Sequence, residues 1–251
     1  MKKTLWFILP IIAVGLAWEV VSRSGIVNPS LFPPVSKVFL ALWEMVNSGI
    51  IITDVGNSLW RLLLGLFFGS VIGIVLGLIT GRVKKVSSLL VPIIQALRPL
   101  PPVAIIPLVI VWLGIDNTAK IFSIAFAVFF PVWINTYIGA QQIPQTFLWS
   151  AKLLTTSTLK VFYRVIFPAT LPFAIAGIRS AIAVSYIMVF VSELAGASSG
   201  LGYRIAIAQS SYRIDEMIAA LIVLGILGAL TDYLFVLSTK KMFPYLALRS
   251  Q

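Results

Sequence analysis

The sequence predicts an all-α membrane protein with six transmembrane helices, and three observations lead to this fold class. Hydrophobic residues make up 59% of the 251 positions and charged residues only 11%, whereas a soluble domain usually has about 25% charged residues. Several apolar stretches reach the roughly 20 residues with which a helix crosses a hydrocarbon core about 30 Å thick. None of these stretches alternates apolar and polar residues with period two, as the strands of a membrane barrel do. We therefore expect helices, which satisfy their own backbone hydrogen bonds in lipid.

The six predicted spans are apolar runs separated by polar, basic or proline-containing segments. They cover about residues 4–21, 58–80, 87–113, 118–140, 170–195 and 216–239. The first run follows Met1-Lys2-Lys3, as a secretory signal would. No small-residue cleavage site precedes a polar region, however, and Trp18-Glu19-Val20 follows instead. We expect this run to be retained as the first span.

The segments between the spans are short. A helix over about 37–46 is expected to lie at the membrane interface between the first two spans. No connecting segment is long enough to fold alone, so we expect a single transmembrane domain over residues 1–251.

The second span carries a glycine every four residues: Gly65, Gly69, Gly73, Gly77 and Gly81. This glycine ladder strips one helix face of side chains and lets another backbone approach closely. We expect it to pack within the molecule, and a dimer seam is the alternative.

The third apolar stretch is interrupted by Arg98-Pro99-Leu100-Pro101-Pro102. Prolines remove backbone donors and break helices. Two alternatives stay open: a broken helix that lines a cavity, as in many transporters, or a turn between a short helix and the true third span.

The connection after the fourth span, from Gln141 to Pro172, predicts an amphipathic helix over Leu148–Tyr163, closed by Phe167-Pro168 and Leu171-Pro172. Such a helix is suited to docking on a partner. The alternative is an interfacial helix that only anchors the loop.

Orientation follows from the basic residues beside each span. Of the 19 Lys and Arg residues, Arg61, Arg98 and Arg179 fall within spans, and the remainder divide eleven to five between the two sides. The richer side usually faces the cytoplasm, so we predict that both termini and the loop after the fourth span are cytoplasmic. The clustering of these residues between apolar runs argues against nucleic-acid binding, despite a net charge of +11.

The composition also excludes several kinds of chemistry. The chain has no Cys and no His, which removes disulfides, thiol catalysis and the usual zinc or haem ligands. It also removes the commonest general base, so an intramembrane enzyme is poorly supported.

Several motifs along the chain carry a family resemblance. In the loop after the fourth span, Trp149-Ser150-Ala151, Thr155 and Val165-Ile166-Phe167-Pro168 stand at the positions of a Glu-Ala-Ala, Gly and Ile-x-Leu-Pro signature, and Ala151 and Pro168 match it strictly. The other motifs are Leu31–Val38, Pro107–Ile115, Lys120–Phe122, Phe130–Thr136, and Glu193 with Gly200–Tyr203. With these residues the chain resembles the permease subunits of ABC importers of the nitrate, sulfonate, taurine and bicarbonate group.

The resemblance implies the type I (MetI-like) permease fold in a bacterial inner membrane. It implies a second permease copy, with a homodimer expected, two cytoplasmic ATPase subunits, and a periplasmic or lipid-anchored solute-binding protein. The solute would be a small anion such as nitrate, bicarbonate or a sulfonate. The subunit would be non-catalytic and hold no cofactor, and the chain has no G-x-x-x-x-G-K-[ST] loop for ATP, so ATP would bind to the partner.

The resemblance also assigns a coupling loop, about residues 141–169, that the ATPase would grip. The residues expected to carry this contact are Trp149, Ser150, Ala151, Lys152, Leu153, Leu154, Thr155, Thr156 and Pro168. Trp149 and Thr155 depart from the acidic residue and the Gly of the family pattern.

Charged residues within spans cost roughly 2.5–3.5 kcal/mol at mid-helix and are candidates for function. Of these we assign Arg98, Arg179 and Glu193 to the translocation pathway. For the two arginines, structural pairing with a carboxylate or a carbonyl is the alternative. Arg61 and Asp232 lie near span ends, where snorkelling to the interface is the simpler expectation.

The alternative function from another class is a secondary transporter driven by an ion gradient. It would typically show internal repeats and membrane-embedded carboxylates for the coupling ion. The sequence shows no clear repeat, and Glu193 is nearly the only acid deep in a span.

Overall fold

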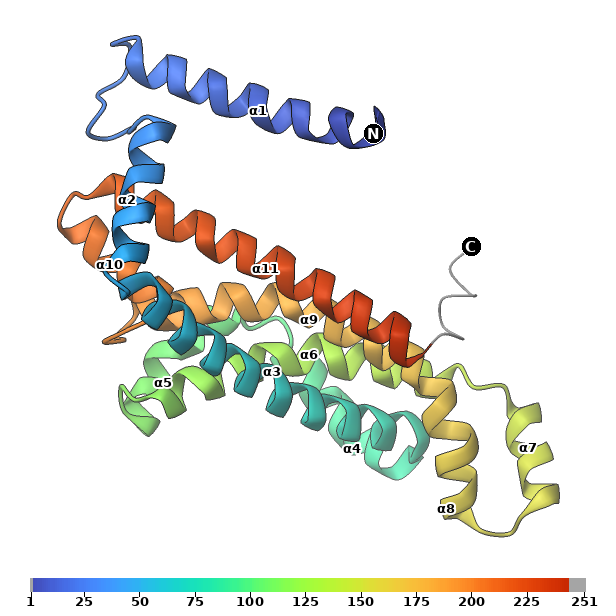
Figure 1. Cartoon of the computed structure of the whole chain (residues 1–251). Helices are drawn as coiled ribbons and strands as arrows, with labels where there is room; N and C mark the ends of the chain where they lie inside the picture. Colours follow the sequence, from blue (N-terminus) through green and yellow to red (C-terminus); the bar gives the residue numbers. More distant parts are fainter. Residues whose placement is uncertain (1, 244–251) are drawn as a thin grey trace. The chain divides into compact units, whose positions relative to one another are not determined.

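The structure, a computed structural model, describes residues 2–243, with the side chains of residues 2–8 and 11 excepted, and every regular element among them is a helix (Figure 1). In chain order the elements are α1 (Lys2–Arg23), α2 (Val35–Asn47), α3 (Ile50–Arg82), α4 (Lys84–Leu97), the 3-10 helix η1 (Pro102–Ile105), α5 (Ile106–Leu113), α6 (Asn117–Gln141), α7 (Gln145–Leu154), α8 (Thr158–Val161), the π-helix η2 (Phe162–Ile166), α9 (Phe167–Leu194), α10 (Leu201–Ser210) and α11 (Ile214–Met242). The all-α prediction is confirmed.

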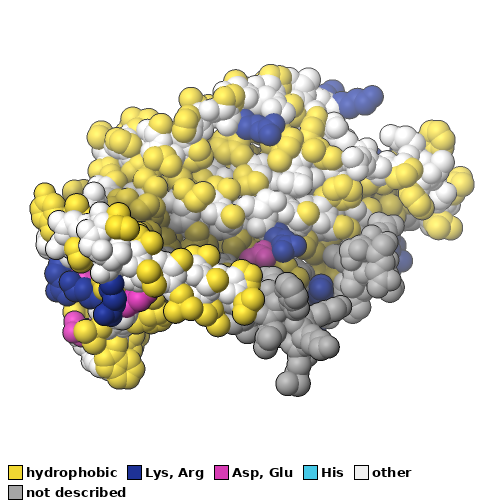
Figure 2. Space-filling view, turned by 90° about the horizontal axis from the view of Figure 1, so that it is seen from above, with side chains coloured by type: hydrophobic (Ala, Val, Ile, Leu, Met, Phe, Trp, Pro, Cys, Tyr) yellow, Lys and Arg dark blue, Asp and Glu magenta, His cyan; other side chains and the backbone are white. Residues whose placement is uncertain are grey.

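Four helical segments in the described part of the chain are long and apolar enough to cross a membrane: α3, α6, the continuous segment Thr158–Leu194, and α11. They coincide with the second, fourth, fifth and sixth predicted spans. Hydrophobic side chains cover much of the face seen in Figure 2, as expected of a protein surrounded by lipid. The first predicted span, 4–21, lies within α1, but part of it falls on side chains outside the described residues. The count of six therefore stays a prediction.

The third predicted span is a bent pair. Lys84–Leu97 and Pro102–Leu113 meet at 88°. The second arm has only twelve residues, or about 18 Å of helix, which is too short to cross the membrane alone. The break therefore falls where the prolines predicted it, and the alternative of a complete third span after the turn is not supported.

The glycine ladder packs against α6. A Cβ added at any of the five glycines would lie 2.5–2.9 Å from an atom of α6, which is closer than real side chains approach. The α6 side chains that face the glycines also repeat every four residues, from Ile124 and Val128 to Ala140. This confirms packing within the molecule. Next to the ladder, the fully buried Trp133 donates its indole N–H to Thr80 Oγ1 at 3.1 Å.

On its other side α6 packs along α9, and Figure 1 shows these two helices side by side. Gly177 of α9 lies against the Pro131 carbonyl and Val132. Among the described residues, seven of the twelve largest fully buried side chains belong to these two helices. They form the framework on which the candidate sites stand.

The chain divides into two compact units. One comprises Met1–Ser58 with Ser198–Ile226, and the other Leu59–Ala197 with Leu227–Gln251. All of the packing described above belongs to the second unit. The expectation of a single domain stays a prediction.

Within the first unit, Asp54 holds the turn that precedes α10. Its carboxylate accepts hydrogen bonds from the Gly200 backbone N–H and from Arg204 Nε, both at 2.8 Å, and it is almost fully buried. Gly200 has a φ of +117°, a conformation that strongly favours glycine. In the same unit α2 is helical where the sequence predicted a short helix, and it buries Val38, Ala41 and Met45.

Candidate functional site

The loop between α6 and α9 is the first candidate site. The prediction of one amphipathic helix over Leu148–Tyr163 is wrong, because α7 ends at Leu154 and α8 begins at Thr158. Thr155 is extended, and its hydroxyl accepts from the Ser157 N–H at 3.3 Å, while Ser157 caps α8 by accepting from the Lys160 N–H at 3.4 Å. Hydroxyl side chains that bond to nearby backbone in this way compete with helix formation. The result is a helical hairpin.

This hairpin is anchored on one side and open on the other. Leu148 of α7 packs with Ile143 and Val161 in a small buried cluster. Leu153 and Leu154, at the end of α7, are 89% and 88% exposed. In Figure 1, α7 and α8 extend away from α6 and α9. The hairpin therefore presents two adjacent apolar side chains at its outer end.

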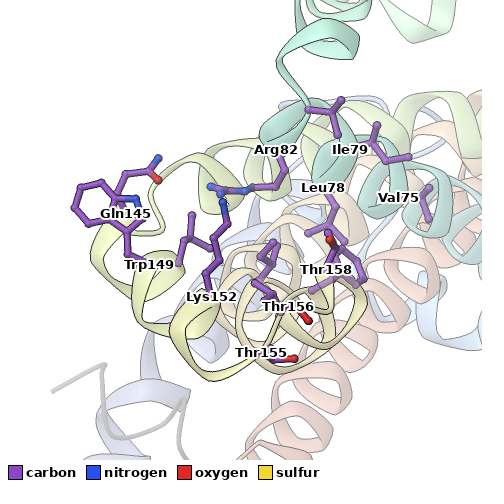
Figure 3. A pocket seen from close by; sticks show the side chains of 15 residues that line it. Val75, Leu78, Ile79, Arg82, Gln145, Trp149, Lys152, Thr155, Thr156 and Thr158 are labelled. Carbon is purple, nitrogen blue, oxygen red and sulfur yellow. The ribbon is translucent and has the colours of Figure 1, made fainter.

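A cavity of about 810 Å³ lies between the hairpin and the last turns of α3. It is lined by Val75, Leu78, Ile79, Arg82, Val83, Gln145, Leu148, Trp149, Lys152, Thr155, Thr156, Thr158, Val161, Phe162 and Ile166. Arg82 and Lys152 are the charged members, and Figure 3 shows both side chains pointing into the space between the two segments.

The predicted coupling residues thus divide into two groups. Four of them line the cavity: Trp149, Lys152, Thr155 and Thr156. Leu153 and Leu154 do not, and Pro168 lines a second cavity, which lies between the end of α6, the start of α7, η2 and the start of α9. Ser150 and Ala151 lie in α7 between Trp149 and Lys152 and do not line the cavity. Their assignment to an ATPase contact stays a prediction.

Among the charges within spans, Glu193 forms a buried ion pair. Arg61 Nη1 donates to Glu193 Oε1 at 2.7 Å, and Arg61 Nε donates to Asn117 Oδ1 at 2.7 Å. The two charged side chains are 4% and 0% exposed. The pair joins α3 to α9 and to the start of α6, where Lys120 donates to the carbonyls of Ile115 and Asp116. The expectation that Arg61 snorkels is wrong, because its side chain is enclosed and paired.

Arg179 and Asp232 form a second pair between α9 and α11. Arg179 Nε and Nη2 donate to the two carboxylate oxygens of Asp232 at 2.9 and 3.0 Å. This is the carboxylate alternative considered for Arg179, and the expectation that Asp232 only snorkels is wrong. The two side chains are 57% and 38% exposed. A charged pair on the outer face of two apolar helices is costly against lipid, so this face is expected to meet water or protein.

Arg98, the third predicted pathway residue, lies at the break between α4 and η1. It is exposed and forms no ion pair with any acid of residues 2–243. The structure thus places Arg98, Arg179 and Glu193 at three separate points, and their assignment to the pathway stays a prediction. Within the same described range, no group of three or more His, Cys, Asp or Glu side chains is placed to hold a metal ion.

Sequence reasoning missed the partners in both pairs. Arg61 and Glu193 are 132 residues apart, and Arg179 and Asp232 are 53 apart. The signal available in the sequence was that acids as well as three arginines fall within the predicted spans, because charges inside a membrane usually pair.

Comparison with known proteins gives one family match. Residues 69–244 match the family described as binding-protein-dependent transport system inner membrane component. A putative aliphatic sulfonates transport permease protein, SsuC of Escherichia coli, is 36% identical over 90% of this chain and 86% of its own length. A nitrate import permease protein, NrtB of Synechocystis, is 36% identical over 70% of this chain and 64% of its own.

Among solved structures, the inward-facing MetNI methionine ABC transporter matches with a TM-score of 0.62. The match covers 78% of this chain and 96% of the other at 20% identity. At that identity the match shows the fold alone.

Proposed function

The chain belongs to the family of binding-protein-dependent transport system inner membrane components, and on this premise we propose that it forms the solute pathway of an importer for a small anion and transmits the work of a separate ATPase. It is a multi-pass membrane protein with the MetI-like permease fold. Permeases of ABC importers are non-catalytic and work with an ATPase and a solute-binding protein. Family membership therefore disfavours the ion-gradient transporter.

The ATPase contact is proposed on the hairpin α7–α8. The observation that carries this proposal is the exposure of Leu153 and Leu154, because adjacent apolar side chains that reach beyond the membrane helices indicate a protein interface. We place this end of the molecule and both termini in the cytoplasm, in accordance with the basic residues that lie beside it. Two ATPase subunits would each hold one hairpin of a permease homodimer.

The pathway is proposed on the face that carries Arg179 and Asp232. This pair is half exposed on helices that are otherwise strongly apolar. A second copy of the chain on this face would shield the pair from lipid and enclose an aqueous route, and symmetric dimers are the commonest assembly. Arg98 would present positive charge to the anion, and Arg179 would do so when it leaves Asp232. The relatives named for sulfonate and nitrate support an anionic solute. Glu193 would act on the pathway indirectly, by holding Arg61.

The decisive experiment replaces both exposed leucines by aspartate, as Leu153→Asp with Leu154→Asp, in permease co-expressed with candidate ATPases. We expect the ATPase to be lost from the purified complex, together with permease-stimulated ATP hydrolysis. The matched control is Leu31→Asp, which places the same charge at a leucine 63% exposed in the segment between α1 and α2. Unchanged co-purification of the ATPase with the double variant would refute the docking assignment.

A further inference from the structure

The cavity between the last turns of α3 and the hairpin has a chemical character that docking of an ATPase does not explain. Its walls are mostly apolar, with Val75, Leu78 and Ile79 on the side of α3. Its volume of about 810 Å³ lies within the range of pockets that bury drug-sized ligands.

The charge in this cavity has one sign. Arg82 and Lys152 line it, and none of its fifteen lining residues is acidic. Arg82 donates one hydrogen bond, to the Ala140 carbonyl at 3.2 Å, and neither cation lies within ion-pair distance of an acid in the part of the chain that the structure describes. Figure 3 shows the two side chains directed toward one another from opposite walls. Converging like charges repel, and an anion between them would relieve the repulsion.

The cavity also lies beside the end of a candidate membrane span. Arg82 is the last residue of α3, which is long and apolar enough to span the bilayer. The residues of α3 that line the cavity recede from Arg82 into the apolar part of this span, through Ile79 and Leu78 to Val75. Trp149, 63% exposed on the hairpin wall, is the residue type that membrane interfaces favour.

We propose that this cavity binds an anionic phospholipid. The phosphate lies between Arg82 and Lys152, and the part of an acyl chain nearest the headgroup lies along Val75, Leu78 and Ile79. Basic pockets between membrane helices are suited to such headgroups. The lipid ties the hairpin to the end of α3 and leaves Leu153 and Leu154 uncovered for another partner. This site depends on the membrane position of α3 and does not depend on ATPase docking.

The test is native mass spectrometry of the purified full chain, without ATPase, in detergent containing phosphatidylglycerol or phosphatidylcholine. We expect the native protein to retain phosphatidylglycerol in preference to phosphatidylcholine. Arg82→Gln and Lys152→Gln should each weaken phosphatidylglycerol binding about fivefold, as expected for one cation near a charged membrane surface. The matched controls, Lys85→Gln and Lys160→Gln, remove exposed cations that do not line the cavity and should bind as the native protein does.

Two results would overturn the proposal. One is equal retention of the two lipids, or an equal loss in the control variants. The other is displacement of the lipid by glycerol phosphate at matched concentration, which would indicate a site for soluble anions. If Arg82→Gln does not fold, Lys152→Gln decides the question, because the Lys152 side chain makes no hydrogen bond or ion pair with residues 2–243 that the substitution would remove.

Discussion

The buried pair between Arg61 and Glu193 leads to a quantitative prediction. Replacing Glu193 by Gln keeps the shape of the side chain but removes the carboxylate that faces Arg61 at 2.7 Å. Because both side chains are at least 96% buried, water cannot replace the lost charge. Removing one partner of a buried pair costs about 3–5 kcal/mol, so we expect the free energy of unfolding to fall by that amount.

The assay is equilibrium unfolding in mixed micelles, followed by circular dichroism, of Glu193→Gln, Arg61→Met and the double variant. The double variant should lose less than the sum of the two single losses, by at least about 2 kcal/mol, since residues in contact couple. The matched control is Glu216→Gln, which breaks the half-exposed pair with Arg213 at 2.9 Å and should cost at most about 1 kcal/mol. Additive losses, or a loss for Glu193→Gln as small as the control, would show that the pair does not stabilise the core in this way.

Three further predictions follow from the packing and from the orientation. Gly69→Ala places a Cβ 2.5 Å from the Ala125 carbonyl oxygen and should lower the free energy of unfolding by about 1–3 kcal/mol. The control, Gly56→Ala in the same helix, meets nothing within 4 Å and should leave the stability unchanged or raise it by up to about 1 kcal/mol. Equal melting temperatures for the two variants would contradict the close approach of α3 and α6. Thr155→Cys, the only thiol in a chain without cysteine, should react with an impermeant maleimide in inside-out vesicles and not in intact cells; labelling confined to intact cells would reverse the orientation. Asp54→Asn weakens the hydrogen bonds that Asp54 accepts from Gly200 and Arg204, so amide hydrogen exchange should accelerate at residues 198–204 and remain unchanged in α6. Exchange at 198–204 as slow as in the native protein would show that Asp54 does not hold this turn.

The parts of the structure that depend on local pattern could be predicted from the sequence. The glycine ladder indicated a close helix approach, because spacing alone fixes which residues share a face. The prolines after Arg98 indicated the break. Two features could not be predicted: which helix packs against the glycine ladder, and the 88° angle of the bend. Both depend on the arrangement of distant segments.

The hairpin shows a failure of local reasoning. The apolar positions on both sides of Thr155 fit one amphipathic helix, and that periodicity was given more weight than the run Thr155-Thr156-Ser157-Thr158. Residues of these types lose conformational freedom in helices or bond to nearby backbone. Four in succession were a signal for a break. The pair of Arg61 with Glu193, by contrast, gave no local signal.

The interlocking of α3 with α6 limits how the protein can move. Each glycine faces a side chain four residues from the next, so the two helices fit only at offsets of about 6 Å, the rise of four residues. At any smaller offset, a side chain of α6 would overlap the backbone of α3. During a transport cycle we therefore expect the glycine-bearing part of α3, Gly65–Gly81, to move with α6 as one rigid body. Conformational change would then occur at other points, such as the bend after α4.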